Sequence, residues 1–270
     1  MLTQTIFNKR RMHHIFRDDG RSLVVAMDHG SGLEVYPALA RPAAVVDAVV
    51  AGGADAVLTT LGIVKQFSSA LRSVGIILRV DGGSTQLAIG ALEYKLLYSI
   101  EDALRLGADA VACMGFPGTH LEAQTLGNLA TLAGHCEAWR VPLMAEMLPG
   151  GLMGSELHTA ENIRLAARIG VELGADFIKT EYVGPAEHFQ QVTENCYRPV
   201  LILGGAKTND EQALFKMVKS SLDIGVAGVV MGRNVWGHAR PRAMVHALSQ
   251  MIHHDASVAD AIEILASATD

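Results

Sequence analysis

The sequence contains few cysteines, and those it has form no metal-binding or redox motif. Cys113, Cys136 and Cys196 lie far apart and include no Cys-x-x-Cys pair, a pattern typical of reduced, buried thiols. The 11 histidines include no His-x-His or His-Glu-x-x-His spacing, and the side chains of neighbours such as His13 and His14 diverge on either regular element. We therefore expect no disulfide, no metal site and no other cofactor.

Charge is also scarce: 19% of the residues are charged, 50% are hydrophobic, and the net charge is −6. A balance of this kind gives no broad attraction for nucleic acid or for an anionic membrane surface. No apolar run reaches the length of a membrane span, and the basic start of the chain is not followed by the apolar region of a signal peptide. These absences predict a cytoplasmic protein whose partner is a small molecule.

What the sequence has in abundance is short aliphatic runs, each followed by a stretch with helical spacing of its apolar residues. Eight such runs start 21 to 34 residues apart, which is room for one strand, one helix and two short loops. The pattern predicts a single α/β domain with the (β/α)₈ (TIM) barrel fold. We expect an N-terminal extension over 1–21, the barrel over 22–252, and a tail or helix over 253–270. The runs begin at Ser22, Ala54, Gly75, Ala108, Val141, Ala175, Pro199 and Ala227.

The phrase Gly-Ala-Asp precedes three of these runs, starting at Gly53, Gly107 and Gly174. Each glycine falls where a helix must stop, which predicts a left-handed cap leading into the next strand. A doubly wound sheet would favour a Gly-x-Gly-x-x-Gly turn after the first strand, and this chain has none there.

Lys179 is the strongest candidate for chemistry. It stands inside the apolar run Phe177-Ile178-Lys179, and the carboxyl ends of barrel strands carry the catalytic groups. A lysine amine that is kept neutral by burial or by nearby positive charge can attack a carbonyl and form an imine. The alternative is structural: the lysine reaches solvent or pairs with Glu181 or Asp28.

Two carboxylates are predicted on the same rim. Asp28 ends the first run and Glu146 stands inside the fifth, so both are candidate acid/base groups for an imine reaction. Asp28 could instead cap a loop, and Glu146 could form a buried ion pair with a lysine. His29 is a candidate substrate contact, or a structural histidine.

The last two runs end in a pattern that favours phosphate binding. Glycine lets backbone amides approach phosphate oxygens at the ends of the last two barrel strands, and an arginine adds a charge-assisted contact. The alternative is that these glycines only form turns, since glycine is common at strand ends for that reason. The candidate substrate-binding residues here are Gly204, Gly205, Lys207, Gly232 and Arg233.

Four segments, SLVVAMDHG, GADFIKTEYVG, LILGGAK and GVVMGRNVW, together resemble the family of archaeal-type class I fructose-bisphosphate aldolases, aminodideoxyheptulosonate synthases and autoinducer-2 phosphate thiolases. The resemblance runs from about Ser22 to His246. It implies that Lys179 forms the Schiff base, that Asp28 is a catalytic carboxylate, and that the glycines with Arg233 hold a phosphate. It also implies a phosphorylated sugar as substrate and a ring-like homo-oligomer.

The chain departs from this family after the fifth strand. Aldolase members carry a Trp-x-Tyr-Pro-Arg-Gly pattern whose tyrosine moves a proton, whereas this chain reads Glu-Met-Leu-Pro-Gly-Gly from Glu146. Leu148 cannot move a proton, so Glu146 is the candidate replacement. The leading prediction is an aldehyde-lyase that cleaves or condenses a phosphorylated ketose or hydroxyketone. An acyltransferase of the thiolase branch and a non-catalytic sugar-phosphate-binding barrel are the alternatives.

Overall fold

Eight parallel strands form a closed barrel in the computed structural model, which describes residues 7–32, 34–88, 93–152 and 154–268. The single (β/α)₈ domain predicted from the spacing is confirmed, with all eight expected runs in the barrel wall. Residues 1–6 of the expected N-terminal extension and the last two residues of the C-terminal segment lie outside the described part. In their order around the barrel, the strands are β1 (Ser22–Ala26), β10 (Gly228–Met231), β9 (Val200–Leu203), β8 (Phe177–Thr180), β7 (Leu143–Met147), β6 (Ala110–Gly115), β3 (Gly75–Arg79) and β2 (Ala56–Thr59).

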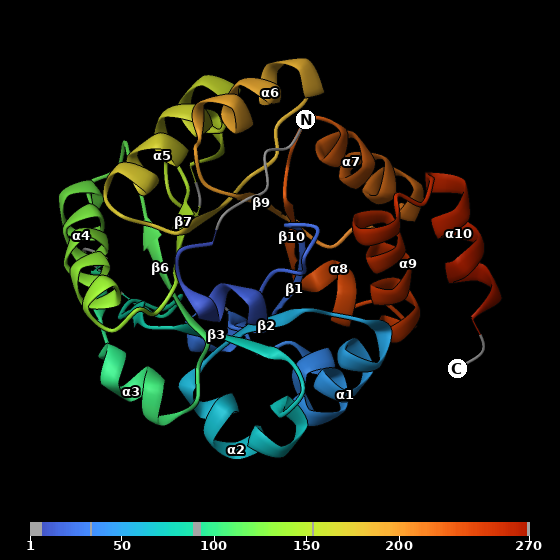
Figure 1. The fold of residues 1–270 in the computed structure, drawn as a ribbon, viewed down its shortest axis with the longest axis horizontal. Coiled ribbons are helices and arrows are strands. Elements are labelled where there is room, and N and C mark those ends of the chain that lie inside the picture. Colours follow the sequence, from blue (N-terminus) through green and yellow to red (C-terminus); the bar gives the residue numbers. More distant parts are fainter. Residues whose placement is uncertain (1–6, 33, 89–92, 153, 269–270) are drawn as a thin grey trace.

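Helices surround the barrel as an outer ring (Figure 1). Their apolar sides pack on strands that are buried from end to end, which is why the runs are continuously aliphatic rather than alternating. No helix within the described ranges is both long and apolar enough to cross a membrane. The helices are α1 (Pro42–Gly52), α2 (Leu61–Leu71), α3 (Ile100–Arg105), α4 (Glu122–Ala138), α5 (Ala160–Glu172), α6 (Ala186–Asn195), α7 (Glu211–Asp223), α8 (Arg233–Trp236), α9 (Pro241–His254) and α10 (Val258–Ser267).

The Gly-Ala-Asp phrases end helices as predicted. Gly53, Gly107 and Gly174 have φ of 100°, 77° and 105°, the left-handed region in which glycine carries no Cβ penalty. At the point of barrel closure Gly228, with φ of 132°, lies so near Ser22 that a Cβ would come 1.9 Å from the Ser22 carbonyl oxygen. A glycine is therefore required for β10 to pair with β1.

The N-terminal segment closes the amino end of the barrel. Met12, Ile15 and Phe16 are buried with strand residues that point into the barrel, and the ring of Phe16 packs edge-on against Phe177 at 5.3 Å. This floor leaves the opposite, carboxyl end of the strands as the place where the barrel can open.

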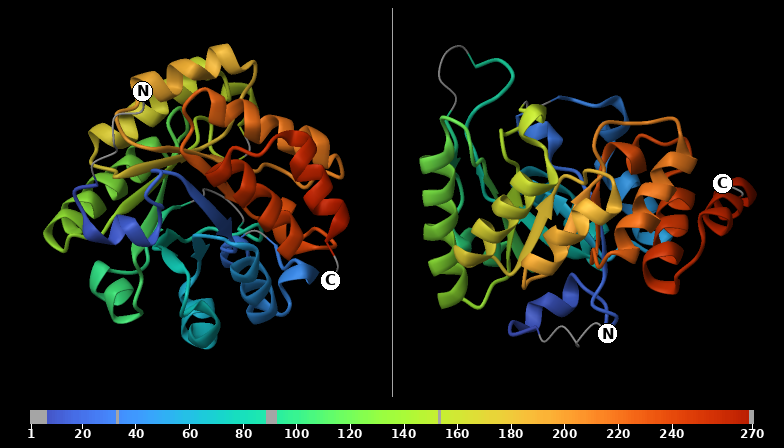
Figure 2. Two further views of the ribbon diagram at one scale, coloured as in Figure 1. Left: turned by 45° about the vertical axis from the view of Figure 1, so that its right-hand side comes forward. Right: turned by 90° about the horizontal axis from the view of Figure 1, so that it is seen from above.

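A two-stranded hairpin stands at that open end. It pairs β4 (Asp81–Gly82) with β5 (Lys95–Leu96) in antiparallel fashion, directly after β3. In the right-hand view of Figure 2 the segment following β4 and the N-terminal segment project from opposite ends of the molecule. The hairpin thus adds a wall to the barrel mouth.

Candidate active site

A cavity of about 520 Å³ lies at the carboxyl ends of the strands. Eight of the nine residues predicted for the site line it, although they come from runs spread over most of the chain. They are Asp28, His29, Glu146, Lys179, Gly204, Gly205, Gly232 and Arg233. Barrel geometry explains the convergence, because all eight strands end at one rim.

Lys179 and Glu146 face each other across two neighbouring strands. The pairing of β7 with β8 places the two residues directly opposite one another, so their side chains emerge together. Lys179 Nζ lies 2.6 Å from Glu146 Oε1, and both side chains are buried. The lysine's partner is thus Glu146, and neither Asp28 nor Glu181 makes that contact.

A buried arginine that the sequence analysis missed joins the carboxylates. Arg79, the last residue of β3, donates from Nε to Asp28 Oδ2 at 3.0 Å and from one terminal nitrogen to Glu146 Oε2. Its other terminal nitrogen lies 3.4 Å from Asp81 Oδ1. The signal was present, since the run from Gly75 ends in Arg-Val-Asp, charged residues where an apolar strand stops.

These cations keep Asp28 and Glu146 ionised. Burial alone would raise the pKa of each carboxyl, but the positive charges of Arg79 and Lys179 outweigh it and lower both pKa values. An ionised carboxylate accepts protons and has none to donate. Before substrate binds, both carboxylates can therefore accept a proton but cannot donate one.

Other titratable groups of the mouth respond mainly to burial. Burial raises the pKa of Asp81 in spite of Arg79, and it raises the pKa of Glu181, at the end of β8. Burial also lowers the pKa of His29 and favours its neutral form.

His29 stands in a small aromatic box. Its ring packs edge-on against Tyr36 and Trp236, with ring centroids 5.7 and 5.4 Å away, and Trp236 Nε1 is held by the Ala26 carbonyl oxygen at 2.8 Å. His29 Nδ1 is buried without a hydrogen-bond partner in the described structure and lies 3.9 Å from Asp28 Oδ1. This nitrogen has almost no exposed surface, so the substrate contact expected for His29 stays a prediction.

The glycines after β9 and β10 form the part of the rim between Lys179 on β8 and Asp28 after β1. Gly205 has φ of 61°, and a Cβ on Gly232 would meet the Ala26 carbonyl oxygen at 2.6 Å. Arg233 donates to the Gly205 carbonyl oxygen at 2.8 Å, and Asn234 donates to the carbonyl oxygens of both Gly204 and Ala206. Two side chains of α8 therefore fix the loop after β9 beside the cavity.

Lys207 is the ninth predicted residue, and the structure does not bring it to the cavity. Its side chain is exposed and passes near Gly237, and it is not among the lining residues. Because β9 already ends at Leu203, the three residues between it and Lys207 carry the lysine away from the mouth.

Leu148 lies just beyond β7 and lines the cavity wall. It is buried in a small apolar cluster with Phe116 and Leu121, so no proton-transfer group occupies this position. Tyr94 and His158 also line the cavity; the sequence analysis singled out neither, because both come from connections and not from strand ends.

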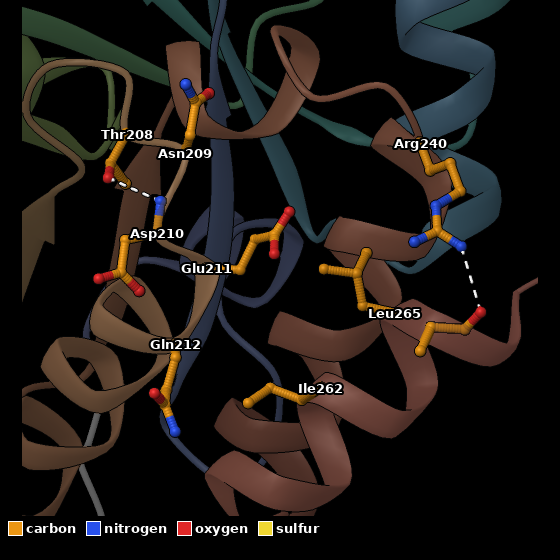
Figure 3. A pocket seen from close by; sticks show the side chains of 9 residues that line it. Thr208, Asn209, Asp210, Glu211, Gln212, Arg240, Ile262 and Leu265 are labelled. Atoms are coloured by element: carbon orange, nitrogen blue, oxygen red, sulfur yellow. Dashed lines mark hydrogen bonds between the residues drawn. The ribbon is translucent and has the colours of Figure 1, made fainter.

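A second hollow lies on the outside of the barrel between the start of α7 and α10 (Figure 3). Its polar groups are largely engaged in local structure: Asp210 caps α7 by accepting from the Ala213 amide, and Arg240 donates to the Ala266 carbonyl oxygen. Among the described residues that line this hollow, none forms a buried pair of acid and base, whereas Lys179 and Glu146 form such a pair in the barrel mouth.

A buried lysine paired with a carboxylate at the carboxyl end of a closed barrel favours an enzyme that works through an imine. The sequence matches the DeoC/LacD family of aldolases over residues 22–238. The chain belongs to this family and is a class I aldolase, a carbon–carbon lyase.

Individual relatives agree with this assignment. The 2-amino-3,7-dideoxy-D-threo-hept-6-ulosonate synthase of Halobacterium salinarum is 37% identical over 91% of each chain. The 2-amino-4,5-dihydroxy-6-oxo-7-(phosphonooxy)heptanoate synthase of Streptomyces griseus is 30% identical over 91% of this chain and 89% of that protein. An archaeal fructose-1,6-bisphosphate aldolase, solved with its catalytic lysine bound to the carbinolamine intermediate, is 30% identical with a TM-score of 0.82, covering 93% of this chain and 99% of its own.

Proposed function

We propose that this aldolase makes or breaks the bond between a phosphorylated hydroxyketone and an aldehyde through an imine on Lys179. The contact of Lys179 Nζ with Glu146 Oε1 carries the proposal. It gives the lysine a base that takes the ammonium proton and frees the amine for attack on the ketone. Glu146 then returns this proton to the carbinolamine hydroxyl, which leaves as water, and an iminium ion remains.

The iminium ion is the electron acceptor for the carbon–carbon step. In the cleaving direction the substrate's β-hydroxyl loses its proton, the bond between its α and β carbons breaks, and the electron pair moves into the iminium to give an enamine. The carboxylates of Asp28 and Glu146 are well placed around this cation, because both are ionised and line the same cavity. Protonation of the enamine and hydrolysis return the free lysine.

The substrate class is proposed from the rim and from the compounds that two of the relatives are named for. The 3,7-dideoxyheptulosonate of the Halobacterium relative has no oxygen on its terminal carbon and would release hydroxyacetone. Arg233 with Gly204, Gly205 and Gly232 forms an anion site, which we assign to the substrate phosphate. The phosphonooxyheptanoate and fructose 1,6-bisphosphate both contain a β-hydroxyketone. Retro-aldol cleavage of either releases dihydroxyacetone phosphate, with an amino-acid aldehyde or glyceraldehyde 3-phosphate as the second product. We therefore propose dihydroxyacetone phosphate as the donor fragment.

Reductive trapping tests this function. Dihydroxyacetone phosphate and sodium borohydride should convert the wild-type protein to a stable adduct whose intact mass rises by one reduced ligand. The Lys179→Met variant should fold and give none, because it lacks the attacking amine. Lys207→Met is the matched control, since it removes an exposed lysine outside the cavity and should trap as the wild type does. A normal adduct on Lys179→Met would refute the assignment.

The setting of the enzyme is proposed on separate grounds. The three cysteines are buried and unpaired in the structure, as in proteins of a reducing compartment, which supports a cytoplasmic enzyme. Exposed apolar side chains such as Val35, Trp139 and Leu165 support assembly into a ring-like homo-oligomer. Sedimentation velocity at several protein concentrations would measure the subunit count.

A further inference from the structure

The carbon–carbon step needs a proton donor, and the two carboxylates that surround Lys179 and Arg79 do not supply one. When an aldehyde is attacked by the enamine, its oxygen becomes an alkoxide and must be protonated. Asp28 and Glu146 are ionised and bound to Arg79, so neither has a proton to donate. Leu148 offers only an aliphatic side chain to the cavity. A donor must come from another part of the mouth.

Tyr94 lies beside the leucine. It belongs to the segment leading into β5 and lines the same cavity as Lys179 and Glu146. It packs against the apolar cluster that contains Leu148, and its ring meets Phe116 edge-on with centroids 5.0 Å apart. The hairpin wall thus brings a phenol onto the patch of cavity wall that Leu148 forms.

The backbone of Tyr94 is held on both sides by α4. Its amide donates to Gln124 Oε1 at 2.9 Å, and its carbonyl oxygen accepts from Asn128 Nδ2 at 2.8 Å. Gln124 and Asn128 are four residues apart and so lie on one face of the helix. These two bonds fix the main chain at residue 94, and with it the point from which the side chain enters the mouth.

We propose that Tyr94 is the catalytic acid of carbon–carbon bond formation, an inference that rests on the proposed imine on Lys179. In the condensing direction the enamine carbon bonds to the aldehyde carbon while the enamine nitrogen becomes an iminium. The electron pair of the carbonyl moves to the aldehyde oxygen, which takes the phenolic proton. The tyrosinate regains its proton from solvent, and cleavage is the reverse of these steps.

The charges around Tyr94 support a protonated phenol. Burial raises the pKa of Tyr94, and the negative charges of Asp81, Glu146 and Asp28 raise it further, while Arg79 opposes them. Those carboxylates can act on Tyr94 electrostatically because the tyrosine faces the mouth. The phenol consequently keeps its proton until a stronger base, the nascent alkoxide, is formed beside it.

Tyr94→Phe removes only the hydroxyl and keeps the ring against Phe116. Condensation of dihydroxyacetone phosphate with glyceraldehyde 3-phosphate or aspartate semialdehyde should fall in kcat by about 10²–10⁴-fold, with little change in KM for the ketone. Borohydride trapping of dihydroxyacetone phosphate on Lys179 should remain at the wild-type level, because the imine forms before the aldehyde arrives.

Tyr98→Phe is the matched control. Tyr98 is four residues further along, packs on the main core and is not among the residues lining the mouth, so its loss should leave kcat unchanged. A Tyr94→Phe enzyme that traps normally and condenses within threefold of the wild-type rate would overturn the role of Tyr94 alone. Failure of the wild type to trap the ketone would instead remove the proposed function.

Discussion

At the scale of single residues, Glu146 connects the two cations of the site. It accepts from Lys179 through one oxygen and from Arg79 through the other. Glu146→Gln keeps the size of the side chain but cannot exchange a proton, so turnover should fall by about 10²–10⁴-fold. Borohydride trapping on Lys179 should persist but develop more slowly, because the amine remains in place while its proton must pass to solvent instead of Glu146. Turnover and trapping need to be measured on the same preparation.

Either of two results would contradict this role. Full turnover would assign proton exchange to Asp28 or His29, and loss of trapping would mean that Glu146 only orients Lys179.

The pH dependence of the free energy of unfolding supplies a further check on Glu146. The pKa of Glu146 is lowered from its ordinary value of 4.5, so its stabilising effect is present above that pH and is lost as the pH falls through the lowered value. The free-energy difference between wild type and variant, from urea unfolding, should shrink correspondingly in acid.

The residues found from the sequence and those missed differ in how they reach the mouth. Lys179 and Glu146 are polar residues inside apolar strands, so the sequence predicts their position, and strand register makes them neighbours. Tyr94 reaches the cavity through a hairpin whose course depends on contacts with α4. No periodicity in the sequence marks such a long-range contact. The partner of Lys179 was likewise undecidable, because it depends on the register of two strands.

At the scale of elements, the ends of β9 and β10 together form the proposed anion site. Arg233 fixes the loop after β9 through the Gly205 carbonyl oxygen and also faces the cavity. Arg233→Ala should weaken binding of dihydroxyacetone phosphate by about 1.5–3 kcal/mol, the range for a hydrogen bond to a charged group. Unphosphorylated dihydroxyacetone should lose much less. Titration calorimetry on the two ligands measures the difference.

Arg240→Ala is the control for net charge, since this arginine lines the outer hollow and not the mouth. This variant should bind both ligands with the affinity of the wild type. Equal losses for both ligands in Arg233→Ala would mean that the arginine supports the loop only and contacts no phosphate. Lys207 illustrates the limit of prediction for this element: a motif places the residue near a strand end, but the direction of the loop decides whether it reaches the cavity.

At the scale of the whole molecule, the N-terminal segment connects several strands to one another at the amino end of the barrel. The aspartates of the three Gly-Ala-Asp phrases each accept from a backbone amide at the start of a neighbouring strand, and each is also bound by a basic side chain of this segment. The pairs are Lys9 with Asp176, His14 with Asp109, and Arg17 with Asp55, and the strand amides are those of Leu143, Ile76 and Leu23. The aspartates of the repeat therefore bind both the starts of the strands and the N-terminal segment that closes the amino end of the barrel.

Lys9 carries the most buried of these contacts. Its ammonium is 2% exposed and lies 2.8 Å from Asp176 Oδ2 and 3.1 Å from the Val141 carbonyl oxygen. Lys9→Met should lower the free energy of unfolding by about 3–5 kcal/mol, because it leaves the Asp176 carboxylate buried without its cation. Arg105→Ala, which breaks an exposed pair with Asp102, should change it by about 1 kcal/mol at most. Urea unfolding measures both, and equal effects would contradict the buried-floor explanation.

The sequence predicts the barrel well because local features, the aliphatic runs and the capping glycines, mark where strands and helices begin and end. The floor is not predicted in this way, since Lys9 and Asp176 are joined only after the barrel has closed. The same closure creates the site, by bringing Asp28 from the first strand to Glu146 and Lys179.

The most direct test of the whole account is the position of the trapped ligand. Wild-type protein reduced with borohydride in the presence of dihydroxyacetone phosphate is digested, and the modified peptide is sequenced by tandem mass spectrometry. The account predicts a single modified lysine, Lys179, at the end of β8. Modification of Lys207 or of another lysine with Lys179 unmodified, or complete absence of an adduct, would contradict it.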